Sequence, residues 1–102
     1  MENRGEIITL SEAIVFTHGY QTANPNAIKA YAVSKDKLLA ILEQENCEGM
    51  RIYNGIDADV ARTNLVLVGI DKEGEDMTQG VIVENLSACP PHCPPKNILI
   101  KK

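Results

Sequence analysis

Hydrophobic positions between residues 10 and 22 recur at helical spacing and predict the first helix of the chain. Thr9-Leu10-Ser11-Glu12 has the form of a capping box, with Thr9 as the N-cap and Glu12 closing the box. The helix should end before Pro25, because the residue that precedes a proline is disfavoured in the α region. The apolar face expected to pack on the core consists of Leu10, Ala13, Ile14, Phe16 and Tyr20.

A second helix is predicted after Ser34, which has the residue type and position of an N-cap. One apolar stripe follows it, made of Leu38, Leu39, Ile41 and Leu42. We expect this helix to end near Asn46, with Gly49 as the break. Residues 27–33 fit both helical spacing and alternation, and we interpret them as mostly extended because Ser34 starts a new element.

After Gly49 the hydrophobic period changes to two, which predicts strands. Residues 50–54 form a first strand, and residues 54–62 form a polar connection. Residues 64–70 are a β-branched run typical of a central strand that is buried on both faces. Residues 71–74 form a hairpin turn, in which Asp71 accepts a backbone hydrogen bond and Gly74 supplies the left-handed residue. Residues 80–84 form the returning strand.

The order of these elements predicts an α+β fold. Two N-terminal helices pack on one face of a three-stranded antiparallel β-meander, and a proline-rich C-terminal tail follows. We expect a single small domain over residues 1–102, with a flexible N-terminus at 1–8 and a Pro/Cys-rich tail at 86–102. Within the tail, residues 97–100 form either a short edge strand or irregular chain. A three-stranded sheet has two open edges and one open face, so we expect a homodimer.

Charge and composition narrow the classes of function. The chain has 102 residues and a formal net charge of −4, which argues against general nucleic-acid binding. No apolar run approaches the roughly 20 residues of a membrane-spanning helix, and no signal peptide is visible. Three cysteines are an odd count, which fits a reducing cytoplasm better than a disulfide scaffold. We therefore expect a cytoplasmic protein with no nucleic-acid or membrane partner.

The sharpest chemical signal is Cys89-Pro90-Pro91-His92-Cys93. It places two thiols and an imidazole within five residues, and zinc prefers these ligands. The candidate metal ligands are therefore Cys89, Cys93 and His92, with Cys47 or His18 as a fourth. The Cys-x3-Cys spacing is not the usual Cys-x2-Cys, and no second paired half is present. A disulfide or redox role, and a stiff tail with unligated cysteines, remain alternatives.

Several other polar residues could take part in catalysis or metal binding, and each also has a purely structural explanation. His18 lies on the shoulder of the first helix, and we interpret it as a boundary histidine bonded to a nearby backbone or carboxylate group. The acidic residues near Asp57 and Asp71 lack the 12-residue loop of a calcium site and are interpreted as solvated turns. No catalytic constellation is visible, so we assign no catalytic or cofactor-binding residue. A small hydrolase or transferase that uses His18 is a third alternative.

Three ordered segments, at residues 38–55, 65–77 and 89–93, resemble a family of small uncharacterised bacterial proteins. In that family a helix ends at Cys-x-Gly. An Arg-Ile-Tyr-x-Gly strand, a Val-Gly-Val-Asp-x-x-Gly hairpin and a C-terminal Cys-Pro-Pro-x-Cys follow, with Ile70 replacing the second valine here. The resemblance implies no activity. It does imply that Cys47, Cys89 and Cys93 belong to one pattern, with His92 in its variable position.

We therefore expect a non-enzymatic interaction or accessory module that self-associates and has an unknown protein partner. The alternative is a metal- or redox-sensing protein that uses the loop between Cys89 and Cys93.

Overall fold

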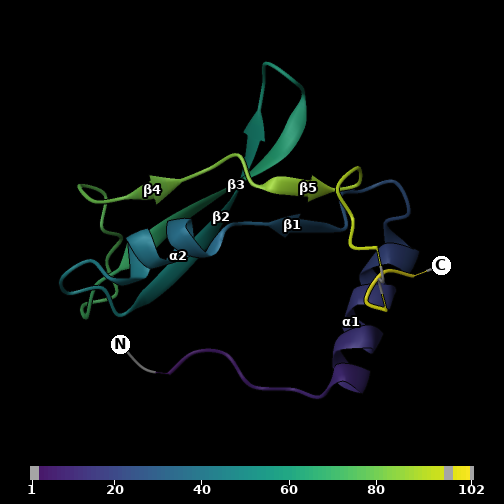
Figure 1. Cartoon of the computed structure of the whole chain (residues 1–102), viewed down its shortest axis with the longest axis horizontal. Coiled ribbons are helices and arrows are strands. Elements are labelled where there is room, and N and C mark those ends of the chain that lie inside the picture. Colours follow the sequence, from purple (N-terminus) through teal and green to yellow (C-terminus); the bar gives the residue numbers. More distant parts are fainter. Residues whose placement is uncertain (1–2, 96–97, 102) are drawn as a thin grey trace. The chain divides into compact units, whose positions relative to one another are not determined.

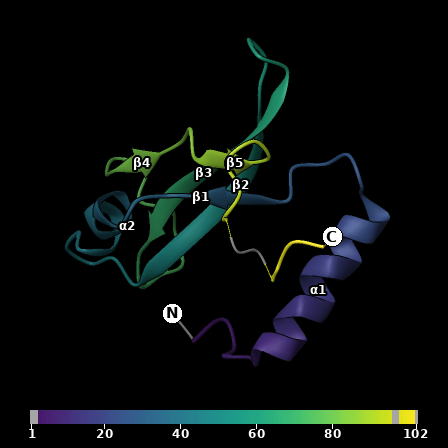
Figure 2. The same ribbon diagram turned by 45° about the vertical axis from the view of Figure 1, so that its right-hand side comes forward.

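The computed structural model describes residues 3–95 and 98–101, which form two helices and five strands (Figures 1 and 2). The predicted α+β class is confirmed. The described chain divides into two compact units. One unit runs from Val33 to Leu86 and is called here the inner unit. The other combines residues 3–32 with the residues from Ser87 onward and is called the outer unit.

The inner unit is built on a three-stranded antiparallel sheet in the order β2-β3-β4. Its strands are β2 (Gly49–Asp57), β3 (Arg62–Ile70) and β4 (Ile82–Val83). As predicted, β3 is the central strand, and its last four residues, 67–70, are consecutively buried. A run of buried neighbours in a strand means that both faces of the sheet are covered there.

The connection between β2 and β3 is shorter than predicted. The two strands pair from Gly49↔Ile70 out to Asp57↔Arg62, so most of the expected polar loop is an extended hairpin. Only residues 58–61 turn the chain, and Ala61 adopts a left-handed conformation with φ of 51°. The Asp57 carboxylate accepts a hydrogen bond from the Asp59 amide over 3.1 Å. The carboxylate therefore stabilises the turn from within.

Helix α2 (Lys35–Leu42) contacts this sheet and buries Ile41 completely. It ends four residues before the expected Asn46, and Gly49 does not break it. The left-handed residue is Asn46, with φ of 71°. Glu48 already donates its amide to the Ile70 carbonyl over 2.7 Å, so Gly49 opens β2. The chain must therefore turn before Gly49.

The turn after β3 has the predicted chemistry. The Asp71 carboxylate accepts the amides of Glu73 and Glu75, both over 3.0 Å, and Gly74 has φ of 83°. The returning strand is reduced to β4, because Gln44 takes the place of a strand partner at Val81. The Gln44 side-chain oxygen accepts the Val81 amide over 2.8 Å.

The outer unit contains α1 (Leu10–Ala23) and a two-stranded antiparallel sheet. The capping box between Thr9 and Glu12 is present as predicted. The sheet pairs β1 (Ala30–Ala32) with β5 (Ser87–Cys89), so residues 30–32 of the segment predicted as mostly extended form a strand. The segment predicted as a tail thus begins with a strand. The packing of both helices on one face of the three-stranded sheet stays a prediction.

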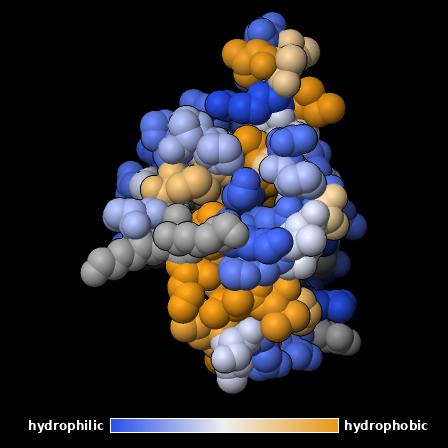
Figure 3. All heavy atoms as spheres, turned by 90° about the vertical axis from the view of Figure 1, so that its right-hand side faces the viewer, coloured by the Kyte–Doolittle hydropathy of each residue, from blue (hydrophilic) through white to orange (hydrophobic). Residues whose placement is uncertain are grey.

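The apolar positions of α1 are not covered as expected. Phe16 is 67% exposed and Tyr20 is 52% exposed, and apolar side chains gather on the face of the molecule drawn in Figure 3. The buried residue of the helix is polar: Gln21 is 5% exposed. Its side chain donates to the Leu99 carbonyl over 3.1 Å and accepts the Lys101 amide over 2.7 Å. Residues 98–101 therefore run beside α1 without strand structure, and Asn97 lies outside the described residues.

Candidate redox site

Cys89 and Cys93 are joined by a disulfide, with their Cα atoms 4.7 Å apart. Cys89 is the last residue of β5, and Cys93 lies in the loop that follows. This separation is within the usual range for bridged cysteines. Of the alternatives that the spacing left open, the structure therefore contains the disulfide.

The backbone of the loop is anchored to both strands of the two-stranded sheet. The Cys89 carbonyl accepts the Lys29 amide over 2.7 Å, next to β1. The His92 amide donates to the Ala88 carbonyl of β5 over 2.9 Å. Pro90 and Pro91 have no amide hydrogen to donate, and both are preceded by cis peptide bonds. The hydrogen bonds of the loop must therefore come from the residues on either side of the prolines.

The two sulfur-bearing residues differ in burial. Cys89 is only 2% exposed and lies beside Ala88, which is also buried. Cys93 is half-buried. A reagent from solvent thus reaches the disulfide from the side of Cys93.

A groove of about 610 Å³ lies against the disulfide. This volume is within the range of small-molecule sites. Among the described residues that line it, none is Asp, Glu, Lys or Arg. The lining residues are Ala30, Tyr31, Ala32, Ser87, Cys89, Pro91, His92, Cys93 and Pro94.

The five candidate metal ligands do not form one cluster. Cys89, His92 and Cys93 lie together, but both thiols are used in the disulfide, and zinc is bound by the thiolate form. His18 faces the Ile98 carbonyl, 3.2 Å from its Nε2 atom, which confirms its interpretation as a boundary histidine. Cys47 belongs to the inner unit and donates its thiol to the Gly49 carbonyl over 3.2 Å. Among residues 3–95 and 98–101, no three His, Cys, Asp or Glu side chains are placed to hold a metal.

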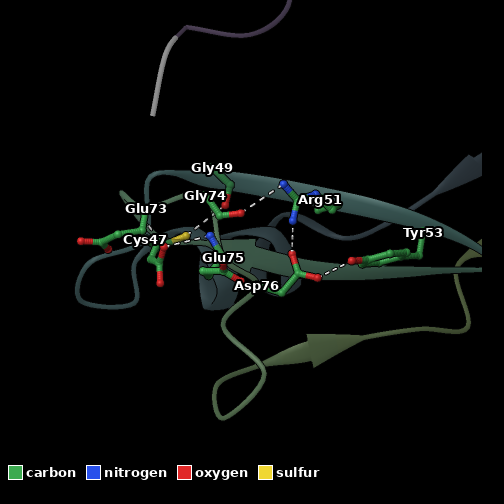
Figure 4. A network of polar contacts seen from close by, with 9 residues as sticks. Cys47, Gly49, Arg51, Tyr53, Glu73, Gly74, Glu75 and Asp76 are labelled. Atoms are coloured by element: carbon green, nitrogen blue, oxygen red, sulfur yellow. Dashed lines mark hydrogen bonds and ion pairs between the residues drawn. The ribbon is translucent and has the colours of Figure 1, made fainter.

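The sequence did not reveal a polar network on the inner unit, drawn in Figure 4. Arg51 and Tyr53 of β2 both bond to the carboxylate of Asp76, one to each oxygen. The Asp76 hydrogen bond is the main reason that the pKa values of Arg51 and Tyr53 are raised above their ordinary range. The i, i+2 spacing of Arg51 and Tyr53 places both side chains on one face of a strand, and this spacing could have indicated that they act together. No sequence pattern indicated their partner Asp76, which lies 25 positions from Arg51.

Arg51 and Asp76 form an ion pair, and the Cys47 thiol drawn with them donates to the Gly49 carbonyl. The second amino group of Arg51 donates to the Gly74 carbonyl over 3.4 Å, so the guanidinium ties β2 to the turn between β3 and β4. We conclude that this network is structural.

A comparison of the chain with protein-family models, curated proteins and solved structures found no match. In the described part of the chain, neither helix is long and apolar enough to cross a membrane. Among the described residues, the Cys89–Cys93 disulfide lies in the wall of a groove and can take part in redox chemistry.

Proposed function

We propose that this chain is a non-enzymatic redox-sensing protein in which Cys89 and Cys93 alternate between a disulfide and a dithiol. The observation that carries the proposal is the pairing of the two thiols in the wall of an open groove. Disulfides in a reducing compartment are mostly transient and serve catalysis or sensing. A cytoplasmic location, as expected from the cysteine count, favours such a role over a purely structural one.

The reaction is a two-electron exchange with an external thiol. Two equivalents of thiol reduce the Cys89–Cys93 disulfide to two thiols and leave as one disulfide of the external thiol. Reduction removes the covalent link between the end of β5 and the loop. The loop is then held by the backbone bonds that Lys29 and His92 donate. Sensing would consist of this change in the wall of the groove.

Equilibration of the native protein in glutathione redox buffers tests the proposal. Alkylation of free thiols followed by mass spectrometry counts reduced cysteines at each ratio of reduced to oxidised glutathione. We expect one reversible two-electron transition in which Cys89 and Cys93 are oxidised together without added mass, whereas in the Cys89→Ser variant Cys93 can form only a mixed disulfide that carries the mass of glutathione. The Cys47→Ser variant is the matched control and should behave as the parent chain. A disulfide that opens only after denaturation would be structural and would overturn the proposal.

Self-association is a second candidate function, favoured by the apolar surface around α1. Six large apolar side chains there are each more than 40% exposed, and exposed apolar side chains that gather on one surface mark interaction sites. The residues are Ile7, Ile8, Leu10, Val15, Phe16 and Tyr20. No charged residue lies between Glu12 and Lys29. Residues 13–23 of α1 therefore carry no charge, and two copies of an acidic chain can meet along this part of the helix without repulsion, so we propose a second copy as its partner.

Native mass spectrometry and light scattering distinguish this candidate from a monomer. We expect a dimer that Phe16→Glu converts to a monomer, because the change places a carboxylate in the contact. Val60→Glu is the matched control, since Val60 is similarly exposed at 59% but lies in the β2–β3 turn. A parent chain that is monomeric at all concentrations, or equal effects of the two variants, would refute self-association through α1.

A further inference from the structure

We infer that an incoming thiol attacks the sulfur of Cys93, that Cys89 is the leaving thiolate, and that the groove selects small uncharged thiols. This inference rests on the redox function proposed above. It adds the direction of the exchange and the class of the reacting molecule.

The direction follows from burial. A thiolate attacks a disulfide along the line of the sulfur–sulfur bond, from the far side of the sulfur that it joins. Cys89 is only 2% exposed, so almost none of its surface is open to an incoming thiolate. Cys93 is half-buried, and its two neighbours in the chain, His92 and Pro94, are exposed, so an incoming thiolate has more access to the sulfur of Cys93. Access of this kind decides which sulfur is attacked.

The class of thiol follows from the lining of the groove. Tyr31, Pro91 and Pro94 supply apolar surface, and Ser87 and His92 supply polar atoms. Among residues 3–95 and 98–101, no lysine or arginine that could pair with a carboxylate lines the groove. A thiol that carries several charges gains nothing there and loses hydration on entry. A small thiol with an uncharged aliphatic or aromatic body matches the wall.

The first exchange transfers the disulfide bond of Cys93 from Cys89 to the external thiol. The external thiolate forms a bond to the Cys93 sulfur, the Cys89–Cys93 bond breaks, and its electron pair stays on the Cys89 sulfur as a thiolate. The product is a mixed disulfide on Cys93. A second external thiol attacks that mixed disulfide and releases a symmetrical disulfide, while Cys93 leaves as a thiolate. Cys89 and the external thiol are thus the two competing resolving groups.

Single-cysteine chains test the direction. Cys89→Ser and Cys93→Ser, each in a Cys47→Ser background, leave one thiol in the loop. Each is treated with 2-hydroxyethyl disulfide, a small uncharged reagent, and the mixed disulfide is followed by mass spectrometry. We expect the chain that retains Cys93 to react at least about tenfold faster than the chain that retains Cys89, in line with access. Equal rates, or faster reaction at Cys89, would overturn the assignment.

Oxidised glutathione, which is charged, tests the selectivity. The ratio of the two reagents' rates is measured for the native chain that retains Cys93 and for the same chain in urea. We expect the native chain to favour the uncharged reagent more strongly than the denatured chain does. An unchanged ratio means that the groove selects nothing. Circular dichroism confirms folding, and Cys89→Ala replaces Cys89→Ser if the buried hydroxyl unfolds the chain.

The two proposals fail in different ways. If the parent disulfide resists thiols in the folded protein, the sensing function is wrong, whatever the single-cysteine rates are. If the parent chain cycles normally but the rates favour Cys89, only the direction is wrong.

Discussion

Gln21 and Lys101 are 80 positions apart, yet the Lys101 amide donates to the Gln21 side chain over 2.7 Å. The other end of the same side chain donates to the Leu99 carbonyl. One amide group thereby satisfies a backbone donor and a backbone acceptor, as a neighbouring strand would. It attaches residues 98–101 to α1 at a position where sequence patterns predict no core residue.

Replacing Gln21 by leucine should destabilise the protein. The change leaves the Lys101 amide and the Leu99 carbonyl without their partner, at a typical cost of about 1–3 kcal/mol for an unsatisfied buried group. Gln79→Leu, at an exposed position, is the control and should change the free energy of unfolding little. Urea denaturation measures both. A Gln21→Leu protein as stable as its parent would show that apolar contact alone holds the C-terminal segment.

The two helix N-caps should respond differently to alanine. Thr9 accepts the Glu12 amide over 3.1 Å, so Thr9→Ala should cost about 1 kcal/mol. Ser34 makes no side-chain cap bond, so Ser34→Ala should stay within about 0.5 kcal/mol of the parent. Thermal or urea unfolding compares the two variants. The prediction is wrong if Ser34→Ala costs as much as Thr9→Ala.

Tyr53 should keep its proton above the ordinary range of a tyrosine, because its hydroxyl bonds to the Asp76 carboxylate and the pKa of Tyr53 is raised. The folded state then binds this proton more tightly than the unfolded state. The resulting stability is complete below the ordinary tyrosine pKa of about 10 and is lost as the pH rises through the higher folded value.

Ultraviolet titration of tyrosinate measures this shift, and Tyr53→Phe identifies which of the three tyrosines gives the late signal. Asp76→Asn should move that signal toward lower pH. If Asp76→Asn leaves the titration unchanged, the carboxylate does not control Tyr53.

Two glycine-to-alanine changes should have opposite effects. A methyl group on Gly80 would lie 2.2 Å from the Gln44 side-chain oxygen, so Gly80→Ala must displace the residue that bonds to Val81. Gly19 lies inside α1 with open space around it, so Gly19→Ala should stabilise the helix by roughly 0.5–1 kcal/mol. Unfolding of each variant in urea checks the signs. A destabilising Gly19→Ala would mean that another chain packs against Gly19, which light scattering can detect.

Local signals predicted the elements whose hydrogen bonds are local. The Thr9–Glu12 box and the Asp71–Gly74 turn close within four residues, so the residue types alone identify them. The left-handed residue after α2 could not be chosen this way. Asn46 rather than Gly49 turns the chain because Glu48 bonds to Ile70, a contact that no local pattern contains.

The sequence predicted which residues of the candidate site lie together, but not their chemical state. Spacing marked Cys89, His92 and Cys93 as a reactive group, but it could not separate ligation from oxidation, since both use the same thiols. Arg51 and Asp76 meet only through the folded hairpins, so sequence patterns placed Asp76 in solvent.

The pairing of β1 with β5 determines when the two-stranded sheet can form during synthesis at the ribosome. The chain leaves the outer unit after Ala32 and returns to it at Ser87. The whole inner unit is therefore synthesised between the two segments that form the outer unit. All residues of the inner unit have therefore emerged before β1 can find its partner. Cys89 and Cys93 emerge after Ser87, and the two-stranded sheet that contains Cys89 can form only then. A nascent chain stalled before Ser87 thus carries neither Cys89 nor Cys93.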